Sequence, residues 1–211
     1  SLDTIRGLSM IPISAYFSYG GWHGLPGNPP IASIRSSYGG QDYESILMKF
    51  GVSTWLWTSP FDGESMFLFK KIKEMGFDTI EIPVEDPQLI EIKTLKEFKN
   101  KNDLNVTICG AFGPGRDLTH NDPLVVHTCM NYIKDCLDIA AELGCTFFAG
   151  PMYSEVGKAR MIPIEQRELE WDRAVSNLRN VCVMADDKGL DIAIEPLNRF
   201  ESDLINNARD V

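Results

Sequence analysis

The sequence predicts an α/β protein of the (β/α)8 TIM-barrel type, with only about the first five βα units present in this chain. Short apolar runs alternate with longer segments of helical periodicity, each run is apolar on both faces, and a polar or aromatic residue follows each run. An open dinucleotide-binding sheet also fits the alternation, but it needs a glycine fingerprint after its first strand, which residues 51–61 lack. Side chains that converge from several strand ends are how barrel enzymes build their sites, so the barrel is the predicted architecture.

The residue pattern gives each element its own signal. Strands are expected at 50–57, 78–83, 105–112, 145–150 and 190–194. Helices are expected at 64–75, 88–101 and 122–143, along the apolar stripe 171–185, and from 204 to 211. The apolar residues of the helix at 122–143 recur at alternating steps of four and three, from Val125 to Ile139, as a buried stripe requires. Gly144 and Gly189 follow the third and fourth helices, where glycine favours termination.

Residues 1–47 differ in composition from everything after them. Gly, Pro, Ser and Tyr crowd 18–40, which is typical of irregular structure. The apolar stretch 8–19 is too short to span a bilayer and lacks the flanks of a signal peptide. We therefore expect an irregular N-terminal extension over 1–47, of different origin, and a barrel domain over 48–211.

Composition limits the partners of the chain. Its 211 residues carry a formal net charge of −10, which disfavours nucleic acid and anionic membranes, since both require a basic surface. A small neutral or cationic molecule fits better. The five cysteines lie in apolar segments without CxxC spacing, so we expect buried free thiols in a reducing compartment, the cytoplasm.

Glu195 is the first candidate functional residue. It ends the apolar strand at 190–194, and Pro196 follows it. A carboxylate at the end of a buried strand is costly unless something binds it. Alternatively, Glu195 has a purely structural role, in which its carboxylate forms an ion pair with Arg199 or another barrel residue. A second carboxylate, Glu201, arrives six residues later.

Four short motifs in residues 48–211 resemble the ketose 3-epimerases (the tagatose, allulose and ribulose 3-epimerase group) among the sugar isomerase and endonuclease IV-like barrels. The most specific is Ile-Glu-Pro-Leu-Asn-Arg-Phe-Glu at 194–201. The others are Phe-Ala-Gly-Pro-Met-Tyr-Ser at 148–154, Arg-Asp-Leu at 116–118, and Gly-Phe-Asp at 76–78 with Ile-Glu-Ile at 80–82. Together, in this order and at these strand ends, they identify the chain as similar to that family.

The resemblance implies a reaction and a set of roles. A divalent metal, Mn2+ or else Co2+ or Mg2+, would be held by Glu195 with Asp, His and Glu from three later strands. Two glutamates would exchange the C3 proton of a ketose through an enediolate, with Glu195 as one of them. Glu201 would bind a substrate hydroxyl near C1. Trp57, Cys109 and Pro151 would form an apolar wall under the sugar, although core packing explains Trp57 and Cys109 equally simply. The family often forms homo-oligomers.

The sequence departs from the family where it ends. It stops at Val211, just after the fifth expected strand, so we expect a truncated chain without the strands that would supply the other ligands. None of its histidines, His23, His120 and His127, follows a strand, and His120 is better explained by a helix-capping turn. Two alternatives stay open. One is a catalytically incomplete partial barrel, serving as a fragment or a binding or structural module, and the other is another sugar isomerase such as hydroxypyruvate isomerase.

Overall fold

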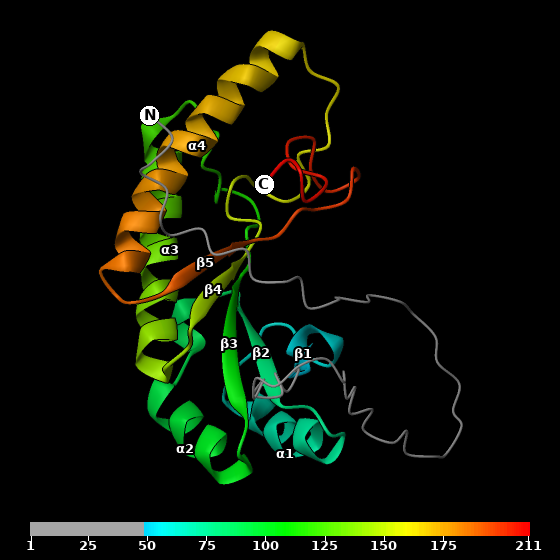
Figure 1. Ribbon diagram of the computed structural model, residues 1–211, viewed down its shortest axis with the longest axis vertical. Helices are drawn as coiled ribbons and strands as arrows, with labels where there is room; N and C mark the ends of the chain where they lie inside the picture. Colours follow the sequence, from blue (N-terminus) through cyan, green and yellow to red (C-terminus); the bar gives the residue numbers. More distant parts are fainter. Residues whose placement is uncertain (1–48) are drawn as a thin grey trace, which may run out of the picture. The chain divides into compact units, whose positions relative to one another are not determined.

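The computed structural model describes residues 49–211, and the extension expected at 1–47 lies outside them. Within the described residues, strands and helices alternate as predicted (Figure 1). The strands are β1 (Gly51–Ser53), β2 (Thr79–Val84), β3 (Asn105–Gly110), β4 (Phe147–Gly150) and β5 (Asp191–Ile194). The α-helices are α1 (Phe67–Glu74), α2 (Ile92–Asn102), α3 (Pro123–Leu143) and α4 (Ile164–Asp186), and the 3-10 turns are η1 (Thr54–Leu56), η2 (Gly63–Met66) and η3 (Pro87–Leu89).

The five strands form one parallel sheet in the order β1-β2-β3-β4-β5. Sequence neighbours are therefore spatial neighbours, and each of the last three crossovers carries one α-helix between the strands it joins. Consecutive parallel strands joined by helical crossovers are the repeating unit of a (β/α)8 barrel. The predicted fold class is confirmed for the part of the chain that the structure describes.

Strand register decides which residues face the interior. The Cα pairing aligns Pro83 with Cys109, Cys109 with Ala149, and Ala149 with Ala193. Because side chains alternate along a strand, residues two positions away share this face. Glu81 lies two residues before Pro83, and Glu195 two residues after Ala193. The opposite face is apolar and fully or almost fully buried, with Ile80, Ile82, Ile108, Phe148 and Ile192 packed into the main core.

Helix α3 shows how local sequence sets an element's limits. Asp122 caps its N-terminus by accepting a hydrogen bond from the Leu124 amide at 2.9 Å. Gly144, with a φ of 70°, ends it in the left-handed region that glycine tolerates best. His120 Nδ1 accepts from the Asp122 amide at 3.0 Å, which confirms the prediction that His120 belongs to a capping turn.

Two expected elements differ in the structure. The first strand ends at Ser53 and continues as η1, so Trp57 lies beyond it. The helix expected at 204–211 is wrong, because this segment forms turns. Its side chains capture backbone groups that a helix would use: Asp210 accepts from the amides of Asn206 and Asn207, and Asn206 donates to the carbonyls of Leu197 and Ser202.

Gly110 ends β3 in a crowded part of the core. A Cβ placed there would lie 2.5 Å from Phe112 Cε2 and 2.8 Å from Phe148 Cζ. Since both rings are buried, we expect Gly110→Ala to lower the free energy of unfolding by about 1–3 kcal/mol through overpacking. Urea unfolding checks this, with Gly113→Ala as the control, because a Cβ at Gly113 meets nothing within 4 Å. Equal unfolding midpoints for the two variants would contradict the packing described here.

No helix among residues 49–211 is long and apolar enough to cross a membrane. All five cysteines are free thiols, four of them buried, as predicted.

Candidate functional site

Two carboxylates on the inner face of the sheet, Glu81 and Glu195, define the candidate site. Glu81 lies within β2 and is 6% exposed. Glu195 follows β5 directly, and its amide donates to the Gly150 carbonyl at 3.1 Å, which extends the strand register by one residue. Burial raises the pKa of the Cys109 thiol on the same face, and the charges of Glu81 and Glu195, near enough to act on it, raise the pKa further. The structure therefore brings two acidic side chains close enough on the inner face of the sheet for their charges to interact.

Glu195 has the electrostatics of an acid–base group. Desolvation raises the pKa of its carboxyl, and the neighbouring charges of Glu81 and Glu201 add to the rise. Within residues 49–211 no ion pair joins Glu195 to Arg199 or to another cation, so the purely structural explanation for Glu195 finds no support there. A raised pKa makes the carboxyl of Glu195 take up a proton more readily than an exposed carboxylate does, which suits a group that exchanges protons.

Glu201 lies in the loop after β5, close enough to Glu195 for their charges to interact. Its carboxylate accepts a hydrogen bond from Asn198 Nδ2. Its carbonyl accepts from the Gly157 amide at 2.7 Å, which ties it to the loop after β4. The structure thus places the second predicted carboxylate within range of the charge of the first.

The three residues predicted to form an apolar wall occupy different positions. Pro151 is buried directly after β4, two residues beyond Ala149 on the inner face. Cys109 is 4% exposed on the same face. Trp57 is half-buried beyond η1, where it packs against the main core and Lys71 Nζ lies 4.7 Å from its ring centroid. Their contact with a sugar stays a prediction.

The described residues do not assemble a complete metal centre. Among residues 49–211 there is no group of three His, Cys, Asp or Glu side chains that can hold a metal ion. The expected set of Glu, Asp, His and Glu is therefore represented here by Glu195 alone.

Arg116, in one of the short motifs, joins the ends of two strands. Its guanidinium donates to the Ala111 carbonyl beyond β3 and, at 2.7 Å, to the Glu85 carbonyl beyond β2. It also lies 3.6 Å from the centroid of the Tyr132 ring on α3. This residue thus fixes the loop that carries its neighbour Asp117.

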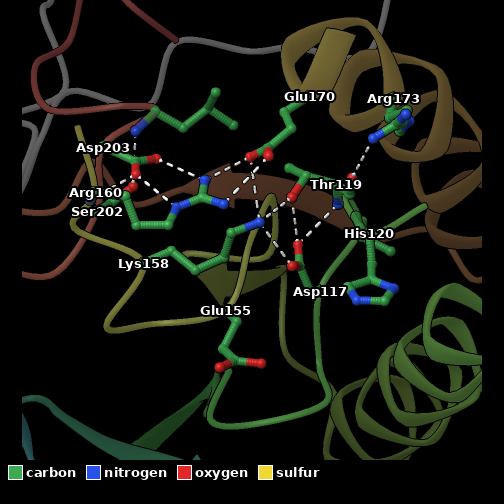
Figure 2. A network of polar contacts seen from close by, with 12 residues as sticks. Asp117, Thr119, His120, Glu155, Lys158, Arg160, Glu170, Arg173, Ser202 and Asp203 are labelled. Atoms are coloured by element: carbon green, nitrogen blue, oxygen red, sulfur yellow. Dashed lines mark hydrogen bonds and ion pairs between the residues drawn. The ribbon is translucent and has the colours of Figure 1, made fainter. Parts of the chain in front are cut away.

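Sequence reasoning missed a buried ion-pair network between the loops that follow β3, β4 and β5 (Figure 2). Lys158 Nζ donates to Asp117 Oδ2 at 2.8 Å and to Thr119 Oγ1 at 2.6 Å, and it lies 3.3 Å from Glu170 Oε2. Arg160 contacts Glu170 and Asp203 through separate nitrogens. The network borders a hollow of about 360 Å³. Apart from Asp117, which belongs to the Arg-Asp-Leu motif, no local pattern marks these residues, because they come together only in the fold.

Glu170 makes this network sensitive to acid. Burial alone would raise the pKa of its carboxyl, but hydrogen bonds from Arg160 and Gln166 and the charge of Lys158 outweigh it and lower the pKa from 4.5 to about 2. A lowered folded-state pKa adds stability above the unfolded pKa that is lost as the pH falls. We therefore expect stability to decline between pH 4.5 and about 2, and Glu170→Gln to reduce that slope. Equal slopes in urea titrations of the two proteins across this range would contradict the assignment.

Comparison with known proteins identifies the family of the chain. The family model described as "Xylose isomerase-like TIM barrel" matches residues 69–211, and the chain belongs to that family. A ketose 3-epimerase of Arthrobacter globiformis is 31% identical over 163 residues, covering 77% of this chain and 55% of the relative. A D-psicose 3-epimerase of Ruminiclostridium cellulolyticum is 27% identical over 166 residues, covering 77% of this chain and 56% of the relative.

Solved structures show the same relationship. The crystal structure of D-psicose 3-epimerase with D-tagatose from Clostridium cellulolyticum H10 aligns with a TM-score of 0.67 and 25% identity, covering 77% of this chain and 57% of that one. A D-allulose 3-epimerase from Methylomonas sp. shares the fold, with a TM-score of 0.72 at 22% identity, covering 77% and 56%. The resemblance to ketose 3-epimerases is confirmed. The chain spans about half the length of the curated relatives it matches.

Proposed function

We propose that this chain takes part in the epimerisation of a ketose at C3 through an enediolate. The observation that carries the proposal is Glu195: a desolvated carboxyl with a raised pKa, immediately after β5 and on the face that holds Glu81 and Cys109. The ketose 3-epimerases among its relatives support the substrate class.

In the proposed reaction, Glu195 exchanges the proton at C3. When the C3–H bond breaks, its electron pair forms a double bond between C2 and C3, and the C2 oxygen becomes negatively charged. Return of a proton to the opposite face from a second glutamate inverts C3. Glu201 binds a hydroxyl near C1, while Cys109 and Pro151, with Trp57 beyond them, form the apolar wall below the sugar.

A divalent cation, Mn2+ by preference over Co2+ or Mg2+, belongs to the proposal, with Glu195 as its ligand in this chain. Hard cations of this kind prefer carboxylate oxygens. The described residues hold no group of three ligands for such an ion, so its other ligands would come from outside them.

Incubation of the chain with D-fructose or D-tagatose and Mn2+, followed by chromatography, tests the function. We expect the C3 epimers, D-psicose and D-sorbose. An aldose product would favour another sugar isomerase, and ketose binding without turnover, measured by calorimetry, would favour the partial barrel that only binds. Absence of both binding and turnover would contradict the proposal.

The cellular compartment and the partners of the protein belong to the same proposal. Five free thiols are compatible with a reducing compartment, and we propose the cytoplasm. We further propose that the chain acts within a homo-oligomer and binds neither nucleic acid nor membrane, in keeping with its net charge of −10.

A further inference from the structure

The loop that carries Glu201 is closed on itself by its own polar groups. The Leu197 amide donates to the Ile205 carbonyl at 3.1 Å, and Tyr153 Oη, fully buried, bridges the same two residues. Asn206 donates to the carbonyls of Leu197 and Ser202. These contacts give the loop its shape, but apart from those of Tyr153 they do not hold it against its neighbours.

A short backbone pairing attaches this loop to the loop after β4. Lys158 and Ser202 form a parallel β-bridge. The Gly157 amide donates to the Glu201 carbonyl at 2.7 Å, and the Asp203 amide donates to the Lys158 carbonyl at 2.8 Å. The backbone on both sides of Ser202 is therefore held by residues 157 and 158.

The ion-pair network fixes that attachment to the rest of the fold. Arg160 joins Asp203 in the Glu201 loop, at 2.9 Å, to Glu170 on α4, at 2.6 Å. Lys158 joins the same Glu170 to Asp117 in the loop after β3. Figure 2 shows the chain of contacts running from Asp203 through Arg160, Glu170 and Lys158 to Asp117. The side chains of Asp117 and Glu170 are only 3% and 7% exposed, so water screens these contacts weakly.

We propose that Arg160 and Lys158 are positioning residues, which hold the Glu201 loop at a fixed distance from Glu195. The role assigned to Glu201 rests on the proposed function, whereas the attachment of the loop does not. Arg160 suits this task because its planar guanidinium binds two carboxylates at once, in fixed directions.

The test replaces Arg160 in the full 211-residue chain. Arg160→Met keeps the aliphatic part of the side chain and leaves Glu170 its contacts with Lys158 and Gln166. Arg160→Lys restores the positive charge without the planar guanidinium that binds two carboxylates. Arg179→Met, the same substitution at an exposed position on helix α4 outside the network, is the control. Asp203→Asn removes the same ion pair from the loop side if Arg160→Met does not fold.

Hydrogen exchange is the first readout, and it needs no substrate. We expect the amides of Gly157 and Asp203 to exchange at least about tenfold faster in Arg160→Met, while the β2 and β3 amides keep their wild-type rates. Arg160→Lys should recover part of the protection, and Arg179→Met should match the wild type. Unchanged exchange at Gly157 and Asp203, or equal acceleration across the sheet, would overturn the inference.

Kinetics are the second readout. Well below the melting temperature, we expect Arg160→Met to raise KM for the ketose about tenfold with kcat within about threefold, because a binding contact is misplaced. The KM of Arg160→Lys should lie between those of the wild type and Arg160→Met. A wild-type chain without epimerase activity would contradict the proposed function, and hydrogen exchange alone would then decide the attachment of the loop. Faster exchange with unchanged KM and kcat in an active chain would overturn the positioning role.

Discussion

Replacement of Glu195 by Gln is expected to lower kcat for C3 epimerisation by about 10²–10⁴-fold, the range that general acid–base groups contribute. The amide keeps the size of the side chain and its place after β5, but it cannot take up or release a proton. The loss should appear in kcat more than in KM, because the C3 proton moves only in the chemical step. Initial rates with D-tagatose or D-fructose measure it.

Glu142→Gln provides the matched control. Glu142 is an exposed carboxylate on α3, whose partner Lys96 lies 3.7 Å away. It faces solvent rather than the inner face of the sheet, so its replacement should leave kcat unchanged. If Glu195→Gln retained wild-type kcat while folding normally, Glu195 would not be the proton-transferring group.

Lys158→Met is expected to have the largest effect on stability. It leaves the charges of Asp117 and Glu170 buried without the cation between them, and breaking a buried ion pair in this way costs about 3–5 kcal/mol. Arg160 still compensates Glu170 in part, so Asp117 should account for most of the loss. Urea unfolding at pH 7 measures it.

Lys188→Met is the control for that experiment. Lys188 also pairs with a carboxylate, Asp138, but it is 25% exposed and the carboxylate side chain is 38% exposed. Partly exposed pairs contribute about 0–1 kcal/mol, so this variant should unfold close to the wild type. Similar losses in the free energy of unfolding for the two variants would show that burial does not determine how much these ion pairs stabilise the fold.

The alternation of apolar runs with helical stripes predicted the order of the strands and helices from β1 to β5. Two predictions failed, one of them where side chains redirect the backbone. Polar side chains such as Asn206 and Asp210 capture amides and carbonyls at 204–211, and the first strand turns into η1 after Ser53. Hydrophobic periodicity does not register such local capture.

Glu195 could be found from sequence because its signal is local: an acidic residue directly after an apolar run. The network of Lys158, Arg160, Glu170 and Asp203 could not, since its members lie on different loops and on α4 and become neighbours only when the strands pair. Each of them alone has the pattern of an ordinary surface charge. Their burial is a product of the tertiary structure.

Deuterium incorporation is the measurement that tests the central claim most directly. The chain is incubated with D-tagatose and Mn2+ in D2O, and the separated ketoses are analysed by mass spectrometry and, after removal of the metal, by NMR. The account predicts a C3 epimer that carries deuterium at C3, formed about 10²–10⁴-fold more slowly by Glu195→Gln. An epimer formed without deuterium at C3, or one formed equally well by Glu195→Gln, would contradict proton exchange at Glu195.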